Sequence, residues 1–204
     1  MVLDADQMLR NMDHRGACGC EPNTGDGAGM LTALPHRWLA QVARTDLGVT
    51  LPEPGHYAAG NIFLPQDPVQ RAHCKALFEK LIVDHGQQLI GWRPLPVDFD
   101  GADVGATARA CAPVLEQLFV GAGVDDPAVF ERDLYRIRKQ AAHQIRGDVK
   151  LSQRELFYVC TLSPSVIVYK GMLTPDQLLP FYPDLRDPEF ETHLAMVHSR
   201  FSTN

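Results

Sequence analysis

The sequence lacks several features that would place it in a specialised class of protein. Its apolar runs fall short of the roughly 20 residues that a membrane-spanning helix needs. The residues after Met1 show neither the basic nor the apolar segment of a secretory signal. Five cysteines, an odd number scattered along the chain, do not fit a disulfide framework. These absences predict a cytoplasmic protein with reduced thiols and no membrane partner.

Positive charge is also scarce. The 204 residues include 19 Lys and Arg against 25 Asp and Glu, so the net charge is −6. A protein that binds nucleic acid through bulk charge has a basic surplus instead, so we expect no nucleic-acid partner. Hydrophobic residues make up 45% and charged residues 22%, which is close to the globular average and argues against wholesale disorder.

Glycine and proline divide the chain into short segments, a pattern typical of a mixed α and β domain. Helical spacing and capping residues predict helices at 4–12, 36–44, 68–84, 107–120 and 176–179. Apolar or alternating runs predict strands at 28–34, 57–64, 88–92, 130–139 and 194–198, with a short helix up to Arg146 after 130–139. Residues 157–162 and 166–170 flank Ser163-Pro164-Ser165, which predicts a β-hairpin.

Some predictions concern single side chains within these elements. The apolar positions of the helix at 68–84 are Val69, Ala72, Ala76, Leu77 and Leu81. The isolated cysteines Cys74, Cys111 and Cys160 lie in apolar patterns and are predicted to be core residues.

Residues 14–29, HRGACGCEPNTGDGAG, are the part of the chain richest in chemically useful side chains. Gly25 and Gly27 match the start of a dinucleotide fingerprint, but Met30 occupies the third position. The elements around the segment also come in the wrong order, so we interpret it as a tight turn. His14, Cys18 and Cys20 are one ligand short of a structural zinc site, so we expect no metal.

A second candidate site is Arg200, which follows a predicted strand and precedes Ser202 and Thr203. The guanidinium fork of arginine matches a carboxylate, and nearby hydroxyls can bind the remaining lone pairs. These residues alone therefore indicate a carboxylate site without identifying a reaction.

Several longer segments resemble the N-terminal region of the glutamate synthase large chain. The segment at 14–29 is similar to the first signature of that family. FYVCTLSPSVIVYKGMLTPDQL (157–178), FYPDLRDPEF (181–190) and HSRFSTN (198–204) follow in the family's order. The resemblance covers essentially the whole chain, 1–204.

The resemblance implies a class II glutamine amidotransferase domain of the N-terminal-nucleophile type. Its fold is α+β, with two stacked antiparallel sheets between helical layers (αββα). In the family an N-terminal Cys attacks glutamine, its own α-amino group is the base, and the products are glutamate and ammonia. The ammonia passes to a synthase region that binds FMN and an iron–sulfur cluster, and we expect that region and both cofactors to be absent from this chain.

Two differences from the family imply an incomplete domain. None of the 13 residues before His14 is a Cys. The family also continues beyond the position of Asn204 into an Asn-Gly pair for the oxyanion hole. Cys20 leads into Glu21-Pro22 and not into an apolar strand, so it does not replace the nucleophile. The resemblance therefore predicts no catalytic residue here and an inactive glutaminase fragment.

The resemblance assigns substrate binding to the C-terminal motif. Arg200 matches the arginine that binds the glutamine α-carboxylate, Thr203 the hydroxyl beside it, and Phe201 a neighbouring pocket residue. Arg15 supports the site. The expected partners are glutamine or glutamate and the remainder of a split glutamate synthase. A non-catalytic module that binds glutamine or glutamate, or that assembles with another fragment, stays open as the alternative.

Overall fold

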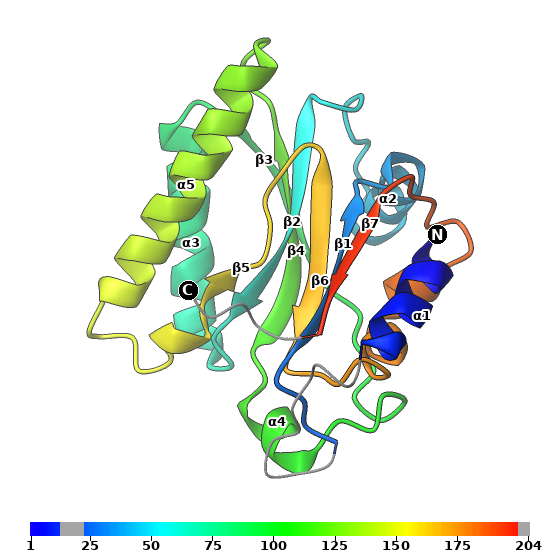
Figure 1. Cartoon of the computed structure of the whole chain (residues 1–204). Coiled ribbons are helices and arrows are strands. Elements are labelled where there is room, and N and C mark those ends of the chain that lie inside the picture. Colours follow the sequence, from blue (N-terminus) through cyan, green and yellow to red (C-terminus); the bar gives the residue numbers. More distant parts are fainter. Residues whose placement is uncertain (13–22, 200–204) are drawn as a thin grey trace. The chain divides into compact units, whose positions relative to one another are not determined.

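A computed structural model describes residues 1–12 and 23–199 of the chain. It has a mixed α and β structure with two antiparallel sheets (Figure 1). The chain divides into two compact units. Unit 1 comprises Met1–Trp38, Pro96–Ala112 and Val168–Asn204, and unit 2 comprises Leu39–Leu95 and Pro113–Ile167. In the part that the structure describes, no helix is long and apolar enough to cross a membrane.

Unit 1 is built on a three-stranded sheet with the order β6-β1-β7 (Figure 1). The strands are β1 (Ala28–Ala33), β6 (Val166–Gly171) and β7 (Ala195–His198). Helix α1 (Val2–Asn11) contacts β7. Shorter helices complete this unit: the start of α2 (His36–Val42), α4 (Ala106–Cys111), α6 (Leu178–Phe181) and the 3-10 turn η4 (Pro183–Arg186).

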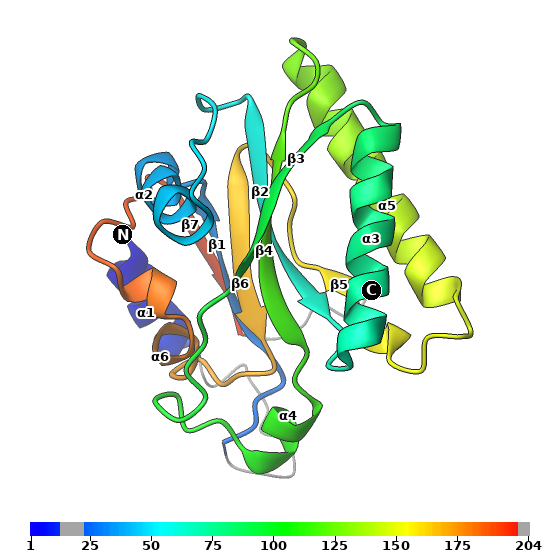
Figure 2. The ribbon, with the colours of Figure 1, turned by 180° about the vertical axis from the view of Figure 1, so that it is seen from behind.

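Unit 2 is built on a four-stranded sheet with the order β3-β4-β2-β5. Its strands are β2 (Tyr57–Leu64), β3 (Gln88–Pro94), β4 (Val114–Gly121) and β5 (Tyr158–Val159). Helices α3 (Pro68–Asp84) and α5 (Pro127–Gly147) lie side by side along one face of this sheet (Figure 2). The π-helix η2 (Ala43–Leu47) and the 3-10 turn η3 (Arg154–Leu156) also belong to unit 2.

Helix α3 shows how local sequence fixes the bounds of an element. The Asp67 carboxylate accepts a hydrogen bond from the Gln70 amide at 2.8 Å, and Pro68 occupies the first turn. Gly86, with φ of +73°, lies just beyond the C-cap residue His85. The prediction of a helix over 68–84 is therefore confirmed.

The face that α3 buries agrees with the predicted apolar positions only in part: Leu81 is buried and Leu77 packs against the core. Val69 is 76% exposed, and the buried residues of this helix are Cys74, Phe78, Leu81 and Ile82. These four lie at i, i+4, i+7 and i+8, which is the spacing of one helical face. They pack with residues of the sheet and of α5 into an aliphatic and aromatic core.

The prediction of a helix over 107–120 is wrong in its second half. Only Ala106–Cys111 is helical, and Val114–Gly121 forms β4, which pairs with β2 and β3 on its two sides. Every residue from Leu115 to Gly121 is buried, so the strand shows no polar alternation. A strand covered on both faces cannot be distinguished from a buried helical segment by periodicity alone.

The strand predicted at 130–139 is also wrong, because those residues lie within the 21-residue helix α5. The order Tyr135-Arg136-Ile137-Arg138 alternates apolar and charged residues, which is the pattern of a strand. In the helix Tyr135 is 54% exposed and Ile137 is fully buried, so the two lie on different faces. The buried positions Phe130, Leu134, Ile137, Ala141 and Ile145 follow helical spacing instead.

The hairpin predicted around Ser163-Pro164-Ser165 does not form. Strand β5 pairs with β2 in the sheet of unit 2, whereas β6 belongs to the sheet of unit 1. The flanking sequences do favour strands, but the partners of both strands come from distant parts of the chain. The short helix predicted at 176–179 is found two residues later, as α6.

Cysteine burial follows the prediction only in part. Cys74 is buried, and burial raises the pKa of its thiol to about 11, with the charge of Asp148 adding to the effect. Cys111 is exposed and Cys160 is half-buried, so the prediction of a core position is wrong for Cys111. Cys18 and Cys20 lie outside the described residues.

Candidate functional site

The four residues predicted for the site, Arg15, Arg200, Phe201 and Thr203, lie outside the described residues. The structure instead describes the segments that adjoin them. Residues 23–29 follow the Arg15 segment, and residues 195–199 lead up to Arg200.

The sheet of unit 1 brings these two segments together. Strands β1 and β7 are antiparallel neighbours, with Gly29 opposite His198 and Thr32 opposite Ala195. Gly29 is the last residue of the glycine-rich motif, and His198 is the first residue of the motif that contains Arg200. Two motifs from opposite ends of the sequence therefore meet in one cross-strand pair.

Only glycine fits at position 29, because side chains from both neighbouring strands lie close to its backbone. A Cβ atom at this position would lie 2.2 Å from Cε1 of His198 and 2.8 Å from Cβ of Lys170. Real Cβ atoms essentially never approach other atoms that closely, so a larger residue would displace His198 or Lys170. The glycine thus lets the imidazole lie across the central strand.

The charge state of His198 follows from this position. Burial lowers the pKa of the imidazole below its ordinary value of 6.5, and the positive charge of Lys170 lowers it further. The ring is therefore neutral at pH 7, with one nitrogen able to donate and the other able to accept a hydrogen bond. Lys170 supplies the positive charge at this end of the sheet.

Gln177 anchors the glycine-rich segment, and sequence reasoning missed it. Its amide Nε2 donates to the carbonyl oxygens of Asn23 at 2.9 Å and Asp103 at 3.0 Å. Its Oε1 accepts a hydrogen bond from the Thr174 amide at 2.8 Å. With only 4% of its surface exposed, Gln177 ties three separate chain segments together. The Thr-Pro-Asp-Gln pattern matches a capping box, which is the signal that could have identified it.

A second close approach holds the same segment. The Gly105 amide donates to the Asn23 carbonyl at 3.0 Å, beside the bond from Gln177. A Cβ atom at Gly25 would lie 2.3 Å from the Leu173 carbonyl oxygen, so only glycine fits there. The described end of the glycine-rich motif is thus fixed by backbone contacts, which supports its interpretation as a structural turn.

The segment at 181–190 has a structural role in unit 1. Tyr169 of β6 packs edge-on against Tyr182 with ring centroids 5.1 Å apart, and Phe190 lies 6.0 Å from the same ring. The Tyr182 hydroxyl donates to the Lys170 carbonyl at 2.7 Å. These contacts hold the end of β6 and thereby position Lys170.

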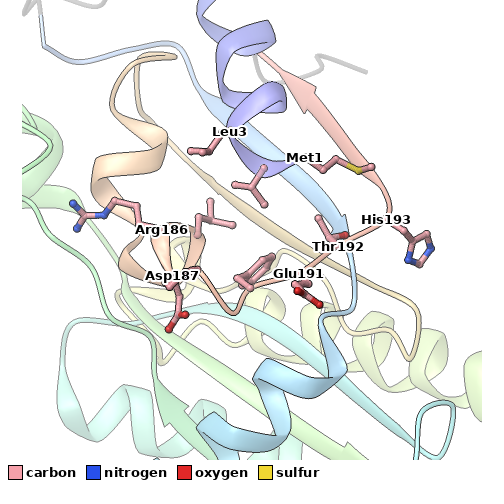
Figure 3. Close-up of a pocket in the computed structure, with 11 residues that line it drawn as sticks. Met1, Leu3, Arg186, Asp187, Glu191, Thr192 and His193 are labelled. Atoms are coloured by element: carbon pink, nitrogen blue, oxygen red, sulfur yellow. The ribbon is translucent and has the colours of Figure 1, made fainter.

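A cavity of about 800 Å³ in unit 1 is lined by the start of α1 and by the segment that follows α6 (Figure 3). Val2, Leu185 and Phe190 give it apolar walls. The side chains of Arg186, Asp187 and His193 point away from one another at its rim (Figure 3). This divergence means that they do not converge on a common ligand atom.

Among residues 1–12 and 23–199, no group of three or more His, Cys, Asp or Glu side chains is placed to hold a metal ion. The candidate set of His14, Cys18 and Cys20 lies outside these ranges.

Comparison with known proteins matches the whole chain to one family. The family model for class-II glutamine amidotransferases covers residues 1–204. The glutamate synthase (NADPH) large chain of Bacillus subtilis is 40% identical over 200 residues, which cover 97% of this chain and 12% of the relative. Glutamate synthase (NADH) of Saccharomyces cerevisiae is 38% identical over 214 residues, which cover 100% of this chain and 10% of the relative.

A ferredoxin-dependent relative shows a similar match. The chloroplastic ferredoxin-dependent glutamate synthase of Oryza sativa is 36% identical over 214 residues, covering 100% of this chain and 12% of the relative. The chain therefore spans about a tenth of the length of these relatives.

Proposed function

Because the chain belongs to the class II glutamine amidotransferases, we propose that it is part of the glutaminase domain of a glutamate synthase. That domain converts glutamine to glutamate and ammonia for glutamate biosynthesis. The main structural support is the pairing of Gly29 with His198, because it joins the glycine-rich motif to the start of the Arg200 motif.

The proposed fold of the complete domain is the N-terminal-nucleophile sandwich (αββα). Two antiparallel sheets, one in each unit, and helices packed on the sheet of unit 2 support it. We expect the domain itself to need no cofactor, since FMN and the iron–sulfur cluster serve the synthase reaction in this family. We expect it to act in the cytoplasm.

Glutamine binding is proposed for the motif that follows β7. Arg200 would pair with the α-carboxylate through its two-pronged guanidinium, Thr203 would donate its hydroxyl, and Phe201 would line the pocket. Lys170 supports this assignment, because its positive charge acts on His198, which begins the motif, and a cation there favours an anionic ligand. Arg15 would support the loop.

Hydrolysis of glutamine needs a nucleophile, and this sequence has no Cys at the position where the family carries it. The family uses the thiol of an N-terminal Cys, activated by its own α-amino group. Here no Cys precedes His14. We therefore propose that the nucleophile is not among these 204 residues and that the 204-residue polypeptide alone is inactive.

Two polypeptides test this proposal. The first is the 204-residue chain, and the second is the same chain extended by the flanking segments of its gene. We expect ammonia release from glutamine only from the second. An inactive extended protein would contradict the proposed function. Activity of the 204-residue chain that is lost when Cys18 or Cys20 is replaced would contradict the proposed origin of the nucleophile.

A further inference from the structure

A basic cleft lies in unit 2, between α5 and the segment of β5. Its volume is about 320 Å³, and its lining includes Arg138, Lys139, Arg146, Phe157, Tyr158 and Cys160. All of these residues belong to unit 2, whereas the segments proposed to bind glutamine belong to unit 1. The cleft is therefore independent of the proposed function.

The charged side chains that line the basic cleft are all positive. Three cationic side chains line it, and no carboxylate does, within the described residues. Asp133 of α5 and Glu155 of η3 each pair with an arginine that does not line the cleft. Asp133 lies 3.3 Å from Arg136, and Glu155 lies 3.7 Å from the neighbouring Arg154. The cleft is thus locally basic on a chain whose net charge is −6.

The cations of the basic cleft are held in place by their neighbours. The Arg146 Nε donates to the Phe157 carbonyl at 3.2 Å, and its guanidinium lies 5.8 Å from the ring centroid of Tyr158. Arg138 and Lys139 lie 5.5 Å and 5.7 Å from the centroid of Tyr135. Such cation–π contacts orient the side chains without neutralising them, so their charge stays available to an anion.

We propose that the basic cleft binds a small phosphate-bearing ligand. Guanidinium groups match the oxygens of a phosphate in a two-pronged geometry, and a lysine adds a point charge. Three cations suit the double negative charge of a phosphate better than the single charge of a carboxylate. The volume lies at the lower end of the range for ligand pockets, which fits a small molecule.

A long polyanion fits the basic cleft less well. Nucleic-acid binding proteins make several phosphate contacts along an extended surface, commonly six or more. The three cations here line a single recess. A discrete phosphate group is the ligand that matches their number and placement.

The test measures binding of inorganic phosphate to the folded 204-residue chain by titration calorimetry and by amide chemical shifts, at constant ionic strength. We expect saturable binding that shifts amides of α5 and β5. Substitution of Arg138→Gln together with Lys139→Gln should weaken binding about tenfold or more, because two charge-assisted contacts are lost. These side chains lie outside the buried core, so circular dichroism should show an unchanged fold.

Arg132→Gln is the matched control. Arg132 is an exposed cation on the same helix that does not line the basic cleft. Its replacement should leave the phosphate affinity within about twofold, since screened surface charges contribute little. Equal weakening by the control would overturn the proposal, as would binding that does not saturate. Binding of glutarate without binding of phosphate would overturn the assignment of the ligand class.

Discussion

The two units of the molecule use their sheets differently. In unit 2, α3 and α5 cover one face of a four-stranded sheet, and their contacts are aliphatic and aromatic. In unit 1, the shorter three-stranded sheet contains close approaches at glycine, a half-buried histidine and a lysine at its end. The aliphatic and aromatic core beneath two long helices lies in unit 2, and the close approaches beside the candidate site lie in unit 1. Substitutions should therefore affect stability most in unit 2 and the proposed binding of glutamine most in unit 1.

The largest effect on stability is expected from Phe78→Ala in unit 2. Phe78 is fully buried and packs edge-on against Trp92, with centroids 5.9 Å apart. Deleting a buried aromatic ring costs about 3–5 kcal/mol of the free energy of unfolding. Val69→Ala, on the exposed side of the same helix, should change it by less than about 0.5 kcal/mol. Urea unfolding measures both, and similar losses would contradict the assignment of the buried face.

A large effect on binding, without a matching loss of stability, is expected from Arg200→Ala in the complete domain. In the proposed site, loss of the charged contact to the α-carboxylate should cost about 2–5 kcal/mol of glutamine binding. The KM for glutamine should rise steeply, and Arg200→Lys should not restore it, because lysine lacks the two-pronged geometry. In a full-length glutamate synthase that carries the same substitution, the ammonia-dependent reaction serves as the control and should survive. A glutamine KM within about twofold of the original would exclude the carboxylate assignment.

Gln177→Leu should destabilise unit 1 without leaving a cavity. The leucine would leave the Asp103 carbonyl and the Thr174 amide without the partner that Gln177 provides. Each buried polar group that loses its partner costs about 1–3 kcal/mol. Thermal unfolding should show this loss, and Gln140→Leu on the exposed face of α5 should not. A neutral Gln177→Leu would mean that the three segments are held by other contacts.

Gly29→Ala should distort the cross-strand pair at the candidate site. The added methyl group would collide with the His198 imidazole, and overpacking of this kind costs about 1–3 kcal/mol. Gly147→Ala is the control, because no atom lies within 4 Å of a Cβ at that position. The His198 ring protons in an NMR spectrum should shift in the first variant only. Unchanged His198 resonances in Gly29→Ala would contradict the close approach.

The smallest effect concerns pH. The pKa of His198 lies below 6.5 in the folded chain, so the unfolded chain binds more protons at mildly acidic pH. The free energy of unfolding therefore falls as the pH is lowered from about 6.5 to the pKa of His198 in the folded chain. His198→Gln should remove this part of the slope between about pH 7 and pH 5, whereas exposed His143→Gln should not. Equal slopes in both variants would exclude a role for His198 burial.

The sequence predicted elements best where local signals fix both ends. Residues 57–64 and 68–84 were assigned with their observed bounds, because Pro65, Asp67 and Gly86 act through nearest neighbours. Strand β4 and helix α5 were missed because their patterns depend on contacts with distant segments. In β4 both faces are buried, and in α5 the residues Tyr135 and Ile137 suggest the wrong period.

In the candidate site, too, some residues could be predicted from the sequence and others are explained only by contacts in the folded chain. The resemblance of the motifs pointed to Arg200 and to the glycine-rich segment, but it gave no reason for Gly29 or Gln177. Gly29 is explained by His198, which lies at the other end of the sequence and reaches it only through strand pairing. Gln177 is explained by the carbonyl groups of Asn23 and Asp103, whose positions depend on the folded loops.

Strand β1 lies in the middle of its sheet, yet its two partners, β6 and β7, begin at Val166 and Ala195. On a ribosome, which adds residues from the N-terminus, β1 therefore emerges long before any strand that can pair with it. The backbone donors and acceptors of β1 that pair with β6 and β7 therefore lack these partners until residues 166–198 have been made. An unpaired strand edge is a site for aggregation, and distant pairing slows folding. The sheet of unit 1 therefore forms only after the residues up to His198 have been synthesised.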